Sequence, residues 1–147
     1  MLGLFASHSW MIMNEPEEKK LRIPSQTFDR FWLFHVYEDY EFKKDKLLRL
    51  SGKWLIFDSI TSIDKHWKKV LDALDNNLLG PSAKVCTSKK KIGFENNDRR
   101  VICVFTEDYN DLDDVWRVEK AIRSIGIENK LLYKLDVDMG KYEKDGF

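Results

Sequence analysis

The sequence predicts an α+β fold, a curved and mostly antiparallel sheet with helices packed on one face. Two observations predict it. Five short segments are rich in β-branched and aromatic residues, and two longer segments repeat apolar residues with the period of an amphipathic helix. These segments follow one another in the order ββαββαβ. Residues 53–135 alone spell βαββαβ, so a ferredoxin-like fold is an alternative that the pattern leaves open.

Two strands precede the first helix. FWLFHVY, residues 31–37, is aromatic and β-branched, as a strand should be. Its alternation places Trp32 and His35 on opposite faces. A polar and charged segment that closes at Gly52 leads into the second strand, KWLIFD, at residues 53–58.

The first helix is expected to begin at Thr61, because Asp64 three residues later completes a capping box. Gly80 and Pro81 are expected to end it. Between them, apolar residues recur on one side, as in an amphipathic helix packed on a sheet. The residues of this stripe are Ile63, Trp67, Val70, Leu71, Leu74 and Leu78.

The second helix is expected to follow Asn110 as its N-cap and to end at Gly126, a residue suited to a left-handed C-cap. Its first turn is acidic, which suits the positive end of the helix dipole and accounts for a run that could be mistaken for a metal site. Its expected buried side consists of Leu112, Val115, Trp116, Val118, Ile122 and Ile125.

Three further strands complete the pattern: AKVCTS at 83–88, VICVFT at 101–106 and KLLYKL at 130–135. Residues 101–106 are apolar on both faces, which is typical of a central, covered strand. Cys86 and Cys103 lie within these strands among apolar residues. We expect two buried thiols in a reducing compartment and no disulfide.

The length of 147 residues suits one compact domain. We expect this domain at residues 31–147, after an N-terminal arm and linker at residues 1–30. Residues 1–13 lack a basic segment and are interrupted by polar residues, unlike a secretory signal. No apolar run approaches the ~18 residues of a membrane span. These features predict a soluble, cytoplasmic protein without a membrane partner.

Composition and motifs exclude several classes of function. Lys plus Arg and Asp plus Glu both number 25, so any anionic partner must be recognised by a local basic patch. The sequence contains no P-loop, no GxGxxG, no GxSxG and no Cys/His cluster with the spacing of a zinc site. We therefore expect no cofactor and no metal, and neither kinase nor conventional hydrolase chemistry.

Three lysines, Lys53, Lys84 and Lys134, each interrupt an otherwise apolar strand. A lysine in such a position must reach water or an anion. If the three share the face opposite the helices, they form a patch that holds a phosphate, with Arg99, Arg100 and Arg117 as peripheral contacts. The loop lysines Lys89, Lys90 and Lys91 would extend the patch. The alternative is that strand lysines protect a sheet edge and loop lysines are simply solvated.

Four stretches, in the same order and spacing, resemble the basophilic-leukaemia-expressed protein family. They are GKW at 52–54, AKV at 83–85, VICVFTEDYNDLDDVWRV at 101–118 and YKLD at 133–136. The chain departs from the family pattern at Leu135, where a proline is favoured, and at Cys86 and Thr87. The resemblance implies the fold of the cap-binding translation initiation factor, in which the open face of a curved sheet is available to a ligand.

The leading hypothesis is a binding module for a phosphate-bearing ligand: a nucleotide, an RNA end or a phosphopeptide. A second hypothesis comes from the label of phosphothreonine lyase sometimes given to the family. A lyase needs a base and an acid, and Lys84 or Lys134 with His35 would supply them. A third hypothesis is a protein-interaction domain that uses a sheet edge or the N-terminal arm.

Cap recognition is a further form of ligand binding to weigh, because two aromatic rings can sandwich a cationic base. Trp67 and Trp116 lie on helix stripes and are expected in the core. A sandwich would need aromatic residues from loops, for which Tyr40, Phe42 and Phe94 are the candidates.

Overall fold

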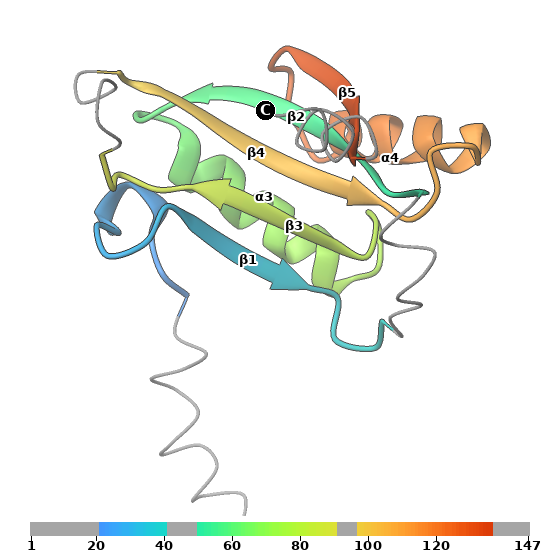
Figure 1. Ribbon diagram of the computed structural model, residues 1–147, viewed down its shortest axis with the longest axis horizontal. Coiled ribbons are helices and arrows are strands. Elements are labelled where there is room, and N and C mark those ends of the chain that lie inside the picture. Colours follow the sequence, from blue (N-terminus) through green and yellow to red (C-terminus); the bar gives the residue numbers. More distant parts are fainter. Residues whose placement is uncertain (1–20, 41–49, 91–96, 137–147) are drawn as a thin grey trace, which may run out of the picture.

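The computed structural model describes residues 21–40, 50–90 and 97–136. In these ranges five strands form one antiparallel sheet in the order β1-β3-β4-β2-β5. The helices α3 and α4 both lie behind the sheet in Figure 1, and neither of these described helices covers the face toward the viewer. The elements are β1 (Trp32–Val36), β2 (Gly52–Ser59), α3 (Ile63–Asp75), β3 (Ser82–Cys86), β4 (Arg99–Thr106), α4 (Leu112–Ser124) and β5 (Leu131–Leu135). The predicted α+β class and the order ββαββαβ are confirmed.

Each helix connects two strands that have another strand between them. The chain leaves β2 through α3 and returns at β3, with β4 lying between the two. It then leaves β4 through α4 and returns at β5, with β2 between them. Residues 52–135 therefore follow the split β-α-β pattern of the ferredoxin-like alternative. β1 adds a further strand at the edge, beside β3.

The core lies between the sheet and the helices. Cross-strand pairing aligns Leu33, Val85, Ile102, Ile56 and Leu131 in one row. The first four are buried against α3 and α4, and Leu131 packs at the margin. β4 is central, as its continuous apolar sequence predicted, because β3 and β2 pair with it on either side. In the described part of the chain, no helix has the length and apolar character to cross a membrane.

The beginning of α3 differs from the predicted capping box. Ser62 is the N-cap, and its side chain makes no capping bond. Asp64 instead accepts hydrogen bonds from the backbone N–H and the hydroxyl of Ser25. Its carboxylate thus holds a short 3-10 helix, η1 (Pro24–Gln26), against α3. The end of the segment expected as a linker therefore packs on the domain.

The end of α3 also comes earlier than predicted. The helix stops at Asp75, and Asn77 has a left-handed backbone with φ of 55°. Leu78, expected on the apolar stripe, is half exposed as a result. The chain turns three residues before the Gly-Pro pair because Asn tolerates the left-handed region that ends a helix.

In α4, two residues expected in the core are exposed. Leu112 and Trp116 have 61% and 52% of their surface exposed, whereas Val115 is buried. Trp116 lies at the rim, where its ring is 5.7 Å from that of Trp54. The N-cap is Asp111, one residue after the predicted Asn110, and it accepts from the backbone N–H of Asp114.

The end of α4 follows the prediction. Gly126 has a φ of 91°, a left-handed conformation that glycine adopts without steric cost. Neither cysteine forms a disulfide, Cys103 is buried and Cys86 is partly buried.

Candidate functional site

The three strand lysines lie on the face of the sheet opposite the helices α3 and α4. We call this the open face. Lys53 is paired with Lys134 across β2 and β5, and with Phe105 across β2 and β4. Lys84 is paired with Phe34 and Cys103. Their sequence neighbours Trp54, Ala83 and Val85 point into the core, so these lysines point away from the helices.

Aromatic rings surround Lys84 on the open face. Its ammonium lies 4.1 Å from the centre of the Trp32 ring, 5.8 Å from that of Phe34 and 5.9 Å from that of Phe105. Cations are attracted to the faces of such rings. Phe34 is 67% exposed, so the aromatic surface beside Lys84 is open to solvent. This part of the face can offer a cation and flat apolar surface to the same ligand.

Lys53 has a different environment from Lys84 and Lys134. It is buried, and its ammonium is 3.0 Å from a carboxylate oxygen of Asp136. The hydroxyl of Ser51 donates to the other oxygen of Asp136. The charge of Lys53 is therefore compensated within the protein, whereas Lys134 is exposed at the edge strand.

Cys103 lies on the same face, between the half-buried Lys84 and the buried Lys53. Burial raises the pKa of its thiol to about 11, although Lys84 and Lys53 act in the opposite direction. The thiol is therefore protonated at neutral pH and is a poor nucleophile.

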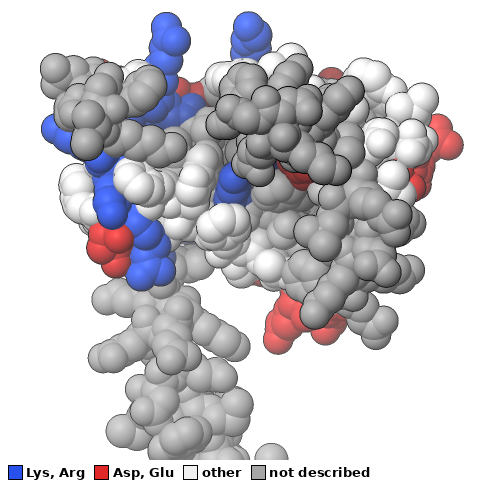
Figure 2. Space-filling view, viewed as in Figure 1, with Lys and Arg blue, Asp and Glu red and all other residues white. Residues whose placement is uncertain are grey.

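A basic hollow of about 320 Å³ lies at the end of the sheet, where β3 ends and β4 begins. Figure 2 shows Lys and Arg side chains gathered at this end, at the left of the view. Four of the lining residues are cationic and none is acidic. The lining residues are Phe31, Trp32, Cys86, Thr87, Ser88, Lys89, Lys90, Asn97, Arg99, Arg100 and Val101.

The side chain of Arg100 is held in this hollow by hydrogen bonds to nearby backbone carbonyl groups. One terminal nitrogen donates to the carbonyl oxygens of Asn97 and Arg99, at 2.7 and 2.9 Å. Its Nε is buried and has no hydrogen-bond partner among the described residues. A buried donor of this kind is stabilised when an acceptor reaches it. The hollow thus combines the held guanidinium of Arg100 with the exposed cations Lys89, Lys90 and Arg99.

His35 lies on the opposite side of the sheet from Lys84. It is paired with Ala83, a core residue, and its Nε2 is 2.7 Å from a carboxylate oxygen of Asp75 in α3. It lines a groove of about 900 Å³ between β1 and α3, with Trp67 and Leu71. The structure therefore does not bring His35 together with Lys84 or Lys134, the pair that a lyase was predicted to use.

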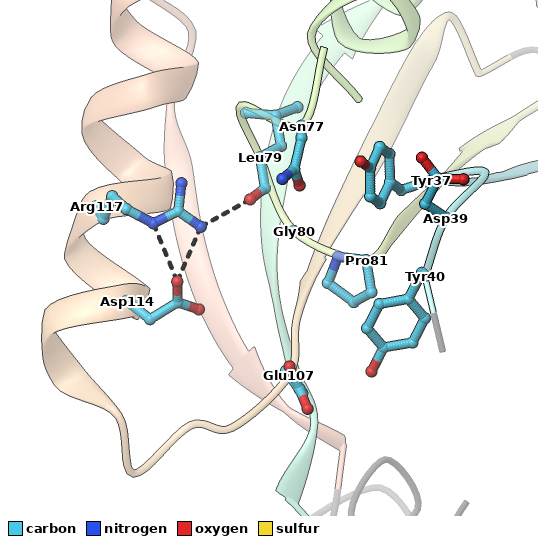
Figure 3. Close-up of a pocket in the computed structure, with 10 residues that line it drawn as sticks. All are labelled: Tyr37, Asp39, Tyr40, Asn77, Leu79, Gly80, Pro81, Glu107, Asp114 and Arg117. Atoms are coloured by element: carbon cyan, nitrogen blue, oxygen red, sulfur yellow. Dashed lines mark hydrogen bonds and ion pairs between the residues drawn. The ribbon is translucent and has the colours of Figure 1, made fainter. Parts of the chain in front are cut away.

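Arg117 is also remote from the open face. It lines a pocket of about 370 Å³ beside α4, drawn in Figure 3. Its guanidinium donates to Asp114 and to the carbonyl oxygens of Leu78 and Leu79, which fixes α4 to the turn after α3. The donors of Arg117 are thus engaged within the protein.

Tyr40 lines the same pocket, on the side opposite Arg117 (Figure 3). Burial, and to a lesser degree the nearby Glu107, raises the pKa of its hydroxyl. The other loop aromatics weighed for cap recognition, Phe42 and Phe94, lie outside the described residues, as does Lys91.

The sequence pattern did not reveal which aromatic residues accompany the lysines. Phe34 comes from β1, which is a neighbour of β3 in space but not in the chain, and Phe105 comes from β4, which follows β3 in the chain and pairs with it. The sequence pattern did not predict Phe57 and Lys130 as site residues, although they lie at the same end of the sheet as the basic hollow. The apolar–basic alternation of each strand was the available signal, but it does not identify cross-strand partners.

The fold and its open face define this chain as a protein built like the cap-binding translation initiation factor. It is similar to the solved structures of eIF4E-3 from Ascaris suum in complex with the m2,2,7G cap and with the m7G cap, each at a TM-score of 0.57 and 16% identity. The matches cover 86% and 88% of this chain, and 71% and 72% of those chains. The chain belongs to the family of the Basophilic leukemia-expressed protein Bles03, whose model matches residues 45–138. The resemblance found in the sequence is confirmed.

Proposed function

We propose that this protein is a binding module for a phosphate-bearing ligand, such as a nucleotide, an RNA end or a phosphopeptide. The observation that carries this proposal is the position of Lys84 among Trp32, Phe34 and Phe105 on the open face. The basic hollow adjoins this surface, because Trp32 belongs to both. Lys84 and the arginines of the hollow bind the phosphate, and a flat group lies against the aromatic rings. Lys134 lies on β5, three strands from Lys84, so it contacts only a ligand that extends across the sheet.

The similar fold of eIF4E-3 supports the proposal by analogy, since that protein was solved with cap nucleotides bound. A shared fold is weak support for a shared ligand. The stronger support is chemical: lysine and arginine bind phosphate oxygens, and exposed rings stack on planar groups. Lys53 contributes to this site indirectly, through its ion pair with Asp136.

The enzymatic alternative has less support. A lyase would need the acid His35 within reach of the reacting atoms that the lysine base contacts. His35 is bonded to Asp75 on the helix side of the sheet. Binding without turnover is therefore the function that this geometry favours.

The interaction-domain alternative is favoured by one observation. β1 is an edge strand among the described residues, and Phe34 and Val36 on it are exposed. Exposed edge strands can accept a further strand from a partner. A partner bound in this way would cover Phe34, so it would compete with a ligand of the open face.

Thermal unfolding of the full chain tests the proposal. The probes are inorganic phosphate, mononucleotides, a cap analogue, a short RNA and a phosphothreonine peptide. A ligand that binds only the native state at 100 times its dissociation constant adds about 2.7 kcal/mol of stability. We expect a stabilisation that Lys84→Gln abolishes and that Lys120→Gln, an exposed position on α4, leaves intact. The absence of any stabilisation across the panel would refute the proposal.

A further inference from the structure

The arginines at the start of β4 lie between two hollows. Arg99 and Arg100 line the basic hollow, and they also line a second hollow of about 660 Å³ on the side of β2. The second hollow contains a further cation, Lys130. Its lining residues are Phe57, Asp58, Ser59, Ser62, Arg99, Arg100, Asn129 and Lys130.

Each hollow contains one exposed phenylalanine with a lysine beside its ring. Phe31 is 37% exposed, and the ammonium of Lys89 is 4.6 Å from its ring centre. Phe57 is 40% exposed, and the ammonium of Lys130 is 5.9 Å from its ring centre. From β1 to β2, this end of the sheet therefore presents Phe31 with Lys89, then Arg99 and Arg100, and then Phe57 with Lys130.

The spacing of the two rings follows from the sheet. Phe31 immediately precedes β1 and Phe57 lies in β2, and these strands are separated by β3 and β4. Adjacent strands are ~4.8 Å apart, so the backbones at Phe31 and Phe57 are at least about 14 Å apart across the sheet. A mononucleotide has one base and cannot contact two rings at this separation.

The acidic side chains near the arginines do not oppose an anion strongly. Asp58 lines the second hollow, but its side chain is 1% exposed and its oxygens accept from Ser62 and His66. Asp98 is exposed in the loop before β4 and lines neither hollow. The buried Nε of Arg100 adds a donor that has no partner among the described residues.

We propose that these two hollows bind a short single-stranded oligonucleotide. Its phosphates cross Arg99 and Arg100, and two of its bases stack on Phe31 and Phe57. Alternating cations and exposed rings are the arrangement that single strands require, because every nucleotide presents one phosphate and one flat base. The inference rests on the proposed function and assigns the ligand class within it. A phosphopeptide would use the arginines but has no reason to need both rings.

Fluorescence anisotropy tests this inference, with labelled decauridine and labelled decathymidine as probes and uridine monophosphate as competitor. We expect the oligonucleotides to bind more tightly than the mononucleotide. Phe31→Leu and Phe57→Leu should each weaken binding about tenfold, because base–aromatic stacking is lost while apolar bulk remains. Both residues are exposed, so the variants should fold, and circular dichroism verifies this.

The dependence of binding on salt gives an independent measurement. If the four cations Lys89, Arg99, Arg100 and Lys130 each contact a phosphate of a single strand, the slope of log K against log salt should be about −3. The double variant Arg99→Gln/Lys130→Gln should bring this slope to about −1.4, because each contact accounts for ~0.7. The matched control is Lys65→Gln/Lys120→Gln, which removes two exposed charges from α3 and α4 and should leave the slope unchanged.

The outcomes separate this inference from the proposed function. Oligonucleotides that bind no more tightly than uridine monophosphate, with no effect of Phe57→Leu, would overturn the inference and leave a one-phosphate site on the open face. A phosphothreonine peptide that displaces decauridine and binds more tightly would overturn the assignment to nucleic acid. Failure of every phosphate-bearing probe would overturn both proposals. Tighter binding of decauridine than of decathymidine would identify RNA, and equal binding would extend the proposal to both.

Discussion

The ammonium of Lys84 lies 4.1 Å from the centre of the Trp32 ring, although 51 residues lie between the two in the chain. The pairing of β1 with β3 brings them to the same face. A lysine held over an indole keeps its charge, and the contact holds that charge on the open face of the sheet. This relationship is the centre of the candidate site.

A double-mutant cycle measures the energy of that contact. Lys84→Gln and Trp32→Leu should each lower the free energy of unfolding. The double variant should lose about 0.5–1 kcal/mol less than the sum of the two single losses, because each single variant already removes the same cation–π contact. Urea unfolding gives the values. The control cycle combines Lys84→Gln with Leu112→Ala on α4, which should be additive. Additivity in both cycles would contradict the contact.

The ion pair between Lys53 and Asp136 should matter for stability. Asp136→Asn would leave the buried ammonium of Lys53 without its counter-charge, and we expect a loss of about 3 kcal/mol in the free energy of unfolding. Lys53→Met in the same chain should restore most of this loss, since an apolar side chain needs no partner. Denaturant unfolding distinguishes the cases, and an Asp136→Asn protein as stable as the parent would refute the prediction.

The stability of the protein should fall in acid partly through Asp58. Burial alone would raise the pKa of Asp58, but hydrogen bonds from Ser62, His66 and the backbone of Ser59 outweigh it and lower the pKa. A lowered folded pKa means that the stabilisation is complete above the ordinary value of about 3.9 and is lost as pH falls through the folded pKa.

Asp58→Asn should therefore show a weaker dependence of unfolding free energy on pH below about 4. Asp113→Asn, at an exposed position in the first turn of α4, is the control and should keep the slope of the parent protein. Equal slopes for the parent and Asp58→Asn would exclude a contribution from Asp58.

Gly80 should not tolerate a side chain. A Cβ at this position would collide with the backbone carbonyl oxygen of Phe105, which cannot move without disturbing β4. We expect Gly80→Ala to lower the midpoint of thermal unfolding, with a cost of about 1–3 kcal/mol, as for other overpacked sites. Ser82→Ala, two residues later, should have little effect. A Gly80→Ala protein of unchanged stability would show that the turn adjusts freely.

Much of the fold could be predicted from the sequence. The period of the apolar residues specified each strand and helix, and the continuous apolar run at 101–106 indicated the central strand. These properties are local, since they depend on side chains a few positions apart. The predictions failed at Asp64 and Trp116, whose surroundings come from distant segments. Asp64 binds Ser25, and Trp116 lies at the rim beside Trp54.

The candidate site could be predicted only in part. The sequence determined that Lys84 and its neighbours alternate between two faces of a strand. It also determined that the charged residues between positions 89 and 100 directly follow that strand. Only the tertiary structure decided that Lys84 faces Trp32 while His35 faces α3. The physical reason is register: Lys84 pairs with Phe34 and His35 with Ala83, and a shift of one residue would have exchanged the faces. The register is set by the burial of Leu33 and Val85 against the helices, a contact between segments far apart in the chain.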